Sequence, residues 1–144
     1  MKMSVKLLSI TTLLVAAVLV GCKKESSDST QSYRADCNGA NEAPPNSSTA
    51  TATFNGTYNS STKSFSGTLI YSGITPTGWY IQRGTASTNG SIVVSLGAVV
   101  SSPFNFSVTL DAAAEAELKA GAYYINVQSV AYPSGEIRGK LVAN

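Results

Sequence analysis

The feature that most constrains the fold of this chain is a long stretch in which apolar and polar residues alternate. In TATATFNGTY, residues 49–58, every second residue is apolar or glycine, and SFSGTLIYSG, residues 64–73, repeats the pattern. A period of two places these residues on one face of a β-strand, whereas a helix needs a period of about 3.6. The polar segment NSSTK between them, residues 59–63, predicts a hairpin turn. We therefore expect two antiparallel strands that share one buried face.

The rest of the chain adds shorter stretches of the same kind and one helix. The further β-like stretches are residues 33–38, 79–83, 91–96, 104–110, 122–130 and 135–142. In DAAAEAELKAG, Asp111 is a suitable N-cap, alanines and glutamates favour a helix, and Gly121 is a suitable stop. Roughly eight short strands and one helix predict an all-β fold, an antiparallel β-sandwich of about 110 residues.

The N-terminus has the pattern of an export signal. Lys2 and Lys6 precede the uncharged apolar segment 7–20, which stops at Gly21-Cys22. This segment is too short for a comfortable membrane span and has no charged stop-transfer flank. We therefore expect residues 1–21 to be removed during export.

The end of this signal, Leu19-Val20-Gly21-Cys22, resembles the lipobox of bacterial lipoproteins. The resemblance implies that Cys22 carries diacylglycerol on its sulfur, becomes the first residue and is acylated on its new amino group, with palmitate as a typical chain. Several chains anchor durably because each buried CH₂ contributes about 0.8 kcal/mol. The expected location is the bacterial cell envelope, at the outer membrane, on either its periplasmic face or its surface face. The alternative is an ordinary signal peptide with a chance cysteine.

Residues 22–32, polar and without an apolar period, predict a flexible tether that holds the domain, residues 33–144, off the membrane. Within the tether, Asp28-Ser29-Thr30 resembles an O-glycosylation motif of Bacteroidetes secreted proteins. A plain linker is the alternative.

Charge and cysteine content exclude several functions. Without Lys2 and Lys6 the chain has equal numbers of basic and acidic residues, so no basic patch predicts a nucleic-acid partner. If Cys22 carries lipid, Cys37 has no partner for a disulfide within the chain. Cys37 shares one face of the expected first strand with Tyr33 and Ala35, and is expected to be a small buried side chain. The sequence contains no histidine that could activate it as a nucleophile.

Two motifs resemble the CHRD domain, a module named from chordin and widespread in bacterial secreted proteins. They are NGANEAPP at residues 38–45 and LKAGAYYINVQSVAYPSGEIRGKL at residues 118–141. The resemblance covers nearly all of residues 33–142 and implies a β-sandwich of immunoglobulin-like layout, akin to Cu/Zn superoxide dismutase. In animals the module accompanies growth-factor antagonism.

The chain departs from that family where its members commonly carry histidines. The resemblance aligns a His-x-His pair with Tyr80 and Gln82, and a further histidine with Gln128. Imidazole suits copper and zinc, and neutral amides bind these ions poorly. We therefore expect no metal and no other cofactor, although the three side chains retain hydrogen-bonding groups.

Six residues form a possible patch for a ligand or partner: Trp79, Tyr80, Gln82, Gln128, Glu136 and Arg138. Tyr80, Gln82 and Gln128 are either a binding patch or ordinary solvent-facing positions of an antiparallel sheet. Trp79 is either an exposed anchor for a protein or glycan, or a core residue.

The segment GEIRGKLV also allows two interpretations. Alternation places Glu136, Arg138 and Lys140 on one face of a strand, and Ile137 and Leu141 on the other. Glu136 and Arg138 are either a recognition pair or the solvent-exposed face of a strand whose apolar side seals the sandwich. The second interpretation predicts that Ile137→Ala destabilises the domain far more than Arg138→Ala.

The sequence contains no Ser-His pairing, phosphate-binding glycine loop or paired acids that would indicate an enzyme. The favoured function is a lipid-anchored, non-catalytic binding or structural module with an unspecified protein or glycan partner. The alternative is a vestigial or unrecognised enzyme or metal-site relative of the Cu/Zn superoxide dismutase-like sandwiches. We expect a monomer.

Overall fold

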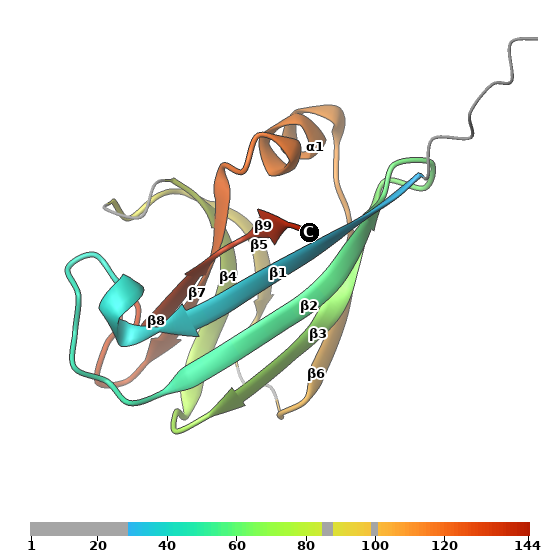
Figure 1. Cartoon of the computed structure of the whole chain (residues 1–144). Coiled ribbons are helices and arrows are strands. Elements are labelled where there is room, and N and C mark those ends of the chain that lie inside the picture. The colour runs from blue at the N-terminus through green and yellow to red at the C-terminus, as the bar shows by residue number, and fades with distance from the viewer. Residues whose placement is uncertain (1–28, 85–87, 99–100) are drawn as a thin grey trace, which may run out of the picture.

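A computed structural model describes residues 29–84, 88–98 and 101–144. The elements in chain order are β1 (Thr30–Asn38), the 3₁₀ helix η1 (Gly39–Asn41), β2 (Thr51–Asn59), β3 (Ser64–Ser72), β4 (Pro76–Arg83), β5 (Ile92–Gly97), β6 (Phe104–Thr109), α1 (Ala112–Lys119), β7 (Tyr123–Ser129), β8 (Ile137–Lys140) and β9 (Val142–Ala143). The predicted all-β fold with one short helix is confirmed (Figure 1).

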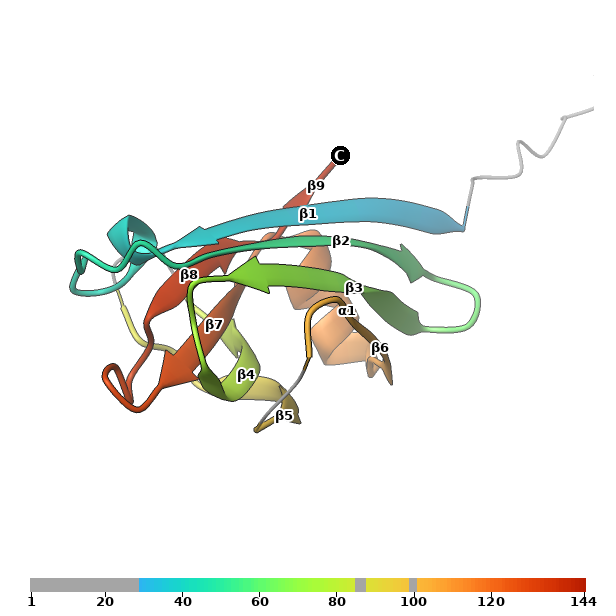
Figure 2. The same cartoon turned by 90° about the horizontal axis from the view of Figure 1, so that it is seen from below.

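The strands form one antiparallel sheet that folds over on itself. Its order is β5-β4-β7-β8-β1-β2-β3-β6, with β9 paired to β1. Only one residue pair, Asn38 with Arg138, joins β1 to β8, and there the sheet turns from one layer to the other. Figure 2 shows β1, β2 and β3 in one layer and β4, β5 and β7 in the other. The molecule is therefore a sandwich that is closed along one side by β8 and β1.

The predicted hairpin is present. β2 and β3 pair over their whole length, with Phe54 opposite Leu69 and Tyr58 opposite Phe65, and residues 60–63 form the turn. These four side chains are at most 1% exposed. The ring of Phe54 lies across Gly56 and Gly67, where a Cβ atom would come within 2.3 Å of the ring. The alternation of the sequence therefore defines both the strand pair and its buried face.

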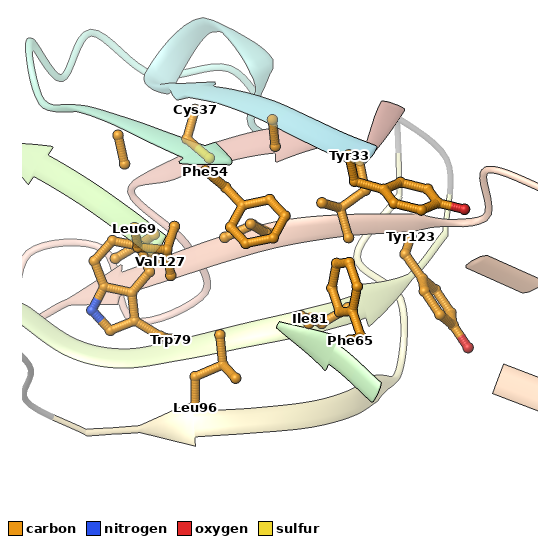
Figure 3. Close-up of a cluster of buried hydrophobic side chains, with 14 of the residues drawn as sticks. Tyr33, Cys37, Phe54, Phe65, Leu69, Trp79, Ile81, Leu96, Tyr123 and Val127 are labelled. Carbon is orange, nitrogen blue, oxygen red and sulfur yellow. The ribbon is translucent and has the colours of Figure 1, made fainter. Parts of the chain in front are cut away.

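The core fills the space between the layers (Figure 3). Phe54, Trp79 and Ile125 are each 0% exposed, and Cys37 is 2% exposed as predicted. Phe54 and Phe65 pack at a centroid distance of 5.5 Å. Such close packing contributes more than the buried area alone.

The helix and the first strand test two boundary predictions. Asp111 caps α1 by accepting a hydrogen bond from the N–H of Ala114 at 2.8 Å, and Gly121 follows it with φ +69°, both as predicted. β1 begins at Thr30, which pairs with Asn59, so residues 30–32 of the predicted tether lie in this strand. Strand β2 pairs with residues 30–32 and supplies hydrogen bonds to their backbone. Cys22 lies outside the described residues, and so does Asp28, the first residue of the predicted glycosylation motif at residues 28–30.

The described part of the chain includes no helix with the length and apolarity needed to cross a membrane.

Candidate functional site

A cluster of polar residues lies on the face of β4, β7 and β8 that points away from the core. The strand register places Gly78 opposite Gln128, Tyr80 opposite Asn126, and Gln82 opposite Tyr124. Asn126 also lies opposite Arg138 on β8. Because residues directly opposite each other in a ladder share a face, Tyr80, Gln82 and Gln128 lie on one face of the sheet. Gln82 is buried there at 6% exposed, whereas Tyr80 and Gln128 are partly exposed. We use the name polar layer for Tyr80, Gln82, Asn126, Gln128 and Arg138, together with Glu42 from the loop after η1.

Trp79 does not belong to this surface. It lies on the opposite face of β4, it is 0% exposed, and its ring is 5.2 Å from that of Tyr71. The core interpretation of Trp79 is confirmed, and the exposed-anchor interpretation is wrong. Alternation along β4 explains this, since Tyr80 and Gln82 take the outer face and Trp79 must take the inner one.

A buried ion pair lies at the centre of the polar layer. Nη2 of Arg138 is 3.0 Å from Oε2 of Glu42, and the two side chains are 2% and 3% exposed. Glu42 lies in the proline-containing loop after η1, close to where the sheet folds over. A buried charge is costly without a partner, so these two residues depend on each other.

Arg138 also holds a second loop. Its Nη1 donates to the backbone oxygen of Thr88 at 3.0 Å, and its Nη2 donates to Oδ1 of Asn89. The guanidinium lies 4.2 Å from the ring centroid of Tyr124, within the range of a cation–π contact. The hydroxyl of Tyr124 accepts from the N–H of Gly90 at 2.8 Å. One side chain therefore connects the loop of residue 42 to the loop of residues 88–90.

Asn126 attaches a third segment, the turn that precedes β8. Its Nδ2 donates to Oε1 of Gln82 at 2.8 Å and to the backbone oxygen of Ser134 at 3.1 Å. Asn126 is 0% exposed. Since the Ser134 oxygen can only accept, it fixes which end of the amide faces the turn.

The expected solvent exposure of Glu136 and Arg138 is wrong. Glu136 is 8% exposed and Arg138 is 2% exposed, whereas Lys140 is exposed as predicted. Alternation itself holds, because Ile137 and Leu141 are buried on the core side. The two charged residues are buried because loops cover the outer face of β7 and β8 at this end.

Glu136 and Arg138 also do not pair with each other. Glu136 instead accepts from the hydroxyl of Ser48 at 2.6 Å, and its backbone oxygen accepts from Nδ2 of Asn46 at 3.0 Å. Glu136 therefore holds the segment that leads from the proline-containing loop into β2.

Gly135 closes the polar layer on the side of the turn. A Cβ atom there would lie 2.4 Å from Oδ1 of Asn126 and 2.6 Å from Oε1 of Glu42, and its φ is +144°. Neither of these oxygens has a hydrogen-bond partner among the described residues. Burial raises the pKa of Glu42, and the guanidinium of Arg138 opposes that shift.

A pocket of about 240 Å³ opens beside this cluster. It lies between the proline-containing loop and the turn before β8, and its wall includes Glu42, Pro44, Pro45, Tyr132 and Pro133. Proline and tyrosine supply rigid apolar surface, and Glu42 adds an acid at the wall. None of the described residues that line this pocket is basic.

Two kinds of chemistry can be checked against the described residues, a reactive thiol and a metal site. Burial raises the pKa of the Cys37 thiol far above its usual range, so the thiolate is disfavoured. Among the residues that the structure describes, no three His, Cys, Asp or Glu side chains are grouped so as to hold a metal ion. The arrangement of Arg138, Glu42 and Asn126 instead orders three loop segments around the pocket.

Comparison with known protein families identifies the domain that carries this site. A model of the CHRD domain matches residues 33–141, from β1 through the end of β8. The chain belongs to the CHRD domain family. No curated protein and no solved structure matches it.

Within this CHRD domain, sequence reasoning missed two central residues of the polar layer, Glu42 and Asn126. Each lies in a motif that carried the family resemblance, NGANEAPP or INVQS. A signal was available, because Glu42 is an acid directly before Ala43-Pro44-Pro45, where no helix or exposed strand explains it. Asn126 alternates with Ile125 and Val127 on a strand that is buried on both faces, as Tyr124 on its own face and Ile125 on the other show.

Proposed function

We propose that this CHRD-domain protein is a lipid-anchored, non-catalytic binding module of the bacterial cell envelope. The lipobox pattern at Cys22 supports the anchor, and the outer membrane is its expected site. The partner is a protein or a glycan that binds in the pocket beside Glu42. The non-catalytic part of the proposal is supported by the roles of the buried polar groups, which connect loops to one another.

The observation that carries the binding role is the position of the pocket relative to the anchor. The tether enters β1 at Thr30, and the loop that lines the pocket follows η1 after the other end of β1 (Figure 1). A strand rises about 3.3 Å per residue, so the nine residues of β1 separate these ends by roughly 30 Å. The pocket therefore lies at the end of the domain that is remote from the lipid.

The pocket is also a fixed shape. Its loop and turn are held from beneath by Glu42, Arg138 and Asn126, and prolines restrict the backbone of its walls. A binding surface that is already ordered loses little conformational entropy when it takes a ligand. The low entropy cost of binding supports a recognition role for this loop.

Replacement of Cys22 tests the anchor. Cys22→Ala removes the acylated residue, so the protein should leave the detergent-phase membrane fraction and accumulate as unprocessed precursor. Processing and membrane association that match the wild type would contradict the lipoprotein assignment.

Site-specific photo-crosslinking in cells tests the pocket. A photoreactive residue at Ser134, on the pocket wall, should give discrete adducts that Tyr132→Ala weakens. The same residue at Asn55, exposed on β2, is the matched control and should give none. Equal labelling at both positions, or no adduct at Ser134, would contradict a binding role for the pocket.

A further inference from the structure

The free edge of strand β6 carries an inference that is independent of the pocket. Within the described residues, β6 pairs with β3 alone, and it is the last strand of the sheet. It lies at the outer edge of its layer in both views (Figures 1 and 2). An unprotected edge presents unpaired N–H and C=O groups to which another strand can bind.

The register identifies which groups these are. The N–H of Leu110 donates to the oxygen of Lys63 at 2.9 Å, so this is a hydrogen-bonded pair of the antiparallel ladder. Hydrogen-bonded pairs recur at every second residue, so Phe104, Phe106 and Val108 also bond to β3. The backbone groups of the alternate residues, Asn105, Ser107 and Thr109, then point away from the sheet.

The side chains of β6 leave apolar surface at the same edge. Phe104, Phe106 and Val108 pack against the core but are only half-buried. Phe54 and Phe65, further into the sandwich, are at most 1% exposed, and Phe106 stacks on Phe54 at 5.5 Å. A further strand beside β6 would cover the rings that the present sheet leaves partly exposed.

The edge also lacks the usual protection against pairing. Proteins commonly place lysine, proline or an inward-pointing charge on exposed edge strands. Between Arg83 and Asp111 the sequence has no charged residue, and β6 itself contains no proline. An edge that is extended, uncharged and alternately apolar fits another strand of the same kind.

We propose that β6 pairs antiparallel with β6 of a second copy of this chain. Around a twofold axis Ser107 lies opposite Ser107 of the second copy, and Asn105 lies opposite Thr109. This register satisfies the outward backbone groups of all three residues and brings Phe106 beside Val108 of the second copy. No like charges meet across the axis, since the strand has none. The inference replaces the expectation of a monomer.

Thiol crosslinking of the full chain in its native membrane tests this register. Ser107→Cys places a thiol next to the axis, so a short-span bis-maleimide should convert much of the processed protein to a covalent dimer. Asn55→Cys, exposed on β2 and two strands from the edge, is the matched control and should remain monomeric. The wild type supplies the background, because Cys37 is 2% exposed.

A second substitution distinguishes strand pairing from simple proximity. Thr109→Pro, added to Ser107→Cys, removes an outward N–H without breaking a bond to β3, and should reduce crosslinking at least tenfold. Thr109→Val keeps the N–H and should leave the yield of crosslinked dimer unchanged. Four results overturn the proposal: no dimer with Ser107→Cys, equal dimer with Asn55→Cys, no effect of the proline at unchanged protein level, or an adduct with a different protein.

Discussion

The two outer faces of the sandwich have similar sequence patterns and different environments. On β2, Thr51 and Asn55 alternate with core residues and remain exposed, and Thr53 between them is partly exposed. On β7 and β8, Asn126 and Arg138 alternate with core residues in the same way and are at most 2% exposed. The difference arises from the loops, because only the second face is covered by the proline-containing loop and the turn before β8. A polar position in an alternating strand therefore indicates the outer face, not exposure to water.

The largest difference between the two faces should appear when Arg138 is removed. Arg138→Ala leaves the carboxylate of Glu42 buried without its charge partner, and should cost about 3–5 kcal/mol of unfolding free energy. Arg34→Ala removes an arginine of an exposed ion pair, with side chains 55% and 58% exposed, and should have no resolvable effect. Chemical denaturation of both variants measures the contrast.

This expectation revises the one based on sequence. Ile137→Ala should cost about 2–5 kcal/mol through its cavity, so the two substitutions should be comparable. An Arg138→Ala variant as stable as Arg34→Ala would show that the polar layer contributes no stability.

A second test of the covered face uses Gly135, which lies in close contact with Asn126 and Glu42. Gly135→Ala forces a Cβ within 2.6 Å of oxygens of Asn126 and Glu42 and strains a backbone with φ +144°. Strain and overlap should each cost about 1–3 kcal/mol. Gly97→Ala is the control, since its φ is +112° but nothing lies within 4 Å of the added atom. Thermal unfolding should show Gly135→Ala as clearly the less stable; equal losses would mean that backbone strain alone is felt.

A third test compares two asparagines. Asn126→Ala deletes the amide that bonds Gln82 and Ser134, leaving buried acceptors unpaired, and should cost about 1–3 kcal/mol. Asn55→Ala, on the exposed face of β2, should change the unfolding free energy by less than about 0.5 kcal/mol. Similar losses in urea denaturation would contradict different environments for the two faces.

Much of the fold follows from local pattern. The hairpin of β2 and β3, the buried face of β1, and the capped helix α1 all agree with alternation, turn residues and caps. These features depend on neighbours in the sequence. The start of β1 at Thr30 was missed because polar residues there are held by pairing with Asn59, which lies far along the chain.

The polar layer could be predicted only in part. Alternation placed Tyr80 and Gln82 on one face and Trp79 on the other, although it did not say which face was the core. It did not reveal that residue 42 approaches residue 138, since that contact forms only when the sheet folds over. Exposure of Arg138 was therefore misjudged, because the loop that covers it comes from a distant part of the chain.

Native-state hydrogen exchange at the loops tests most directly whether Arg138 orders the two loops that it contacts, the loop of residue 42 and the loop of residues 88–90. The reporters are the amides of Asn46 and Gly90, bonded to Gly39 and Tyr124. In Arg138→Gln these two amides should lose protection together, while the amide of Gly135, in the turn that Asn126 holds, and the amides of the β2–β3 hairpin keep theirs. Loss at one of the two loops only, or unchanged protection at both, would contradict the account.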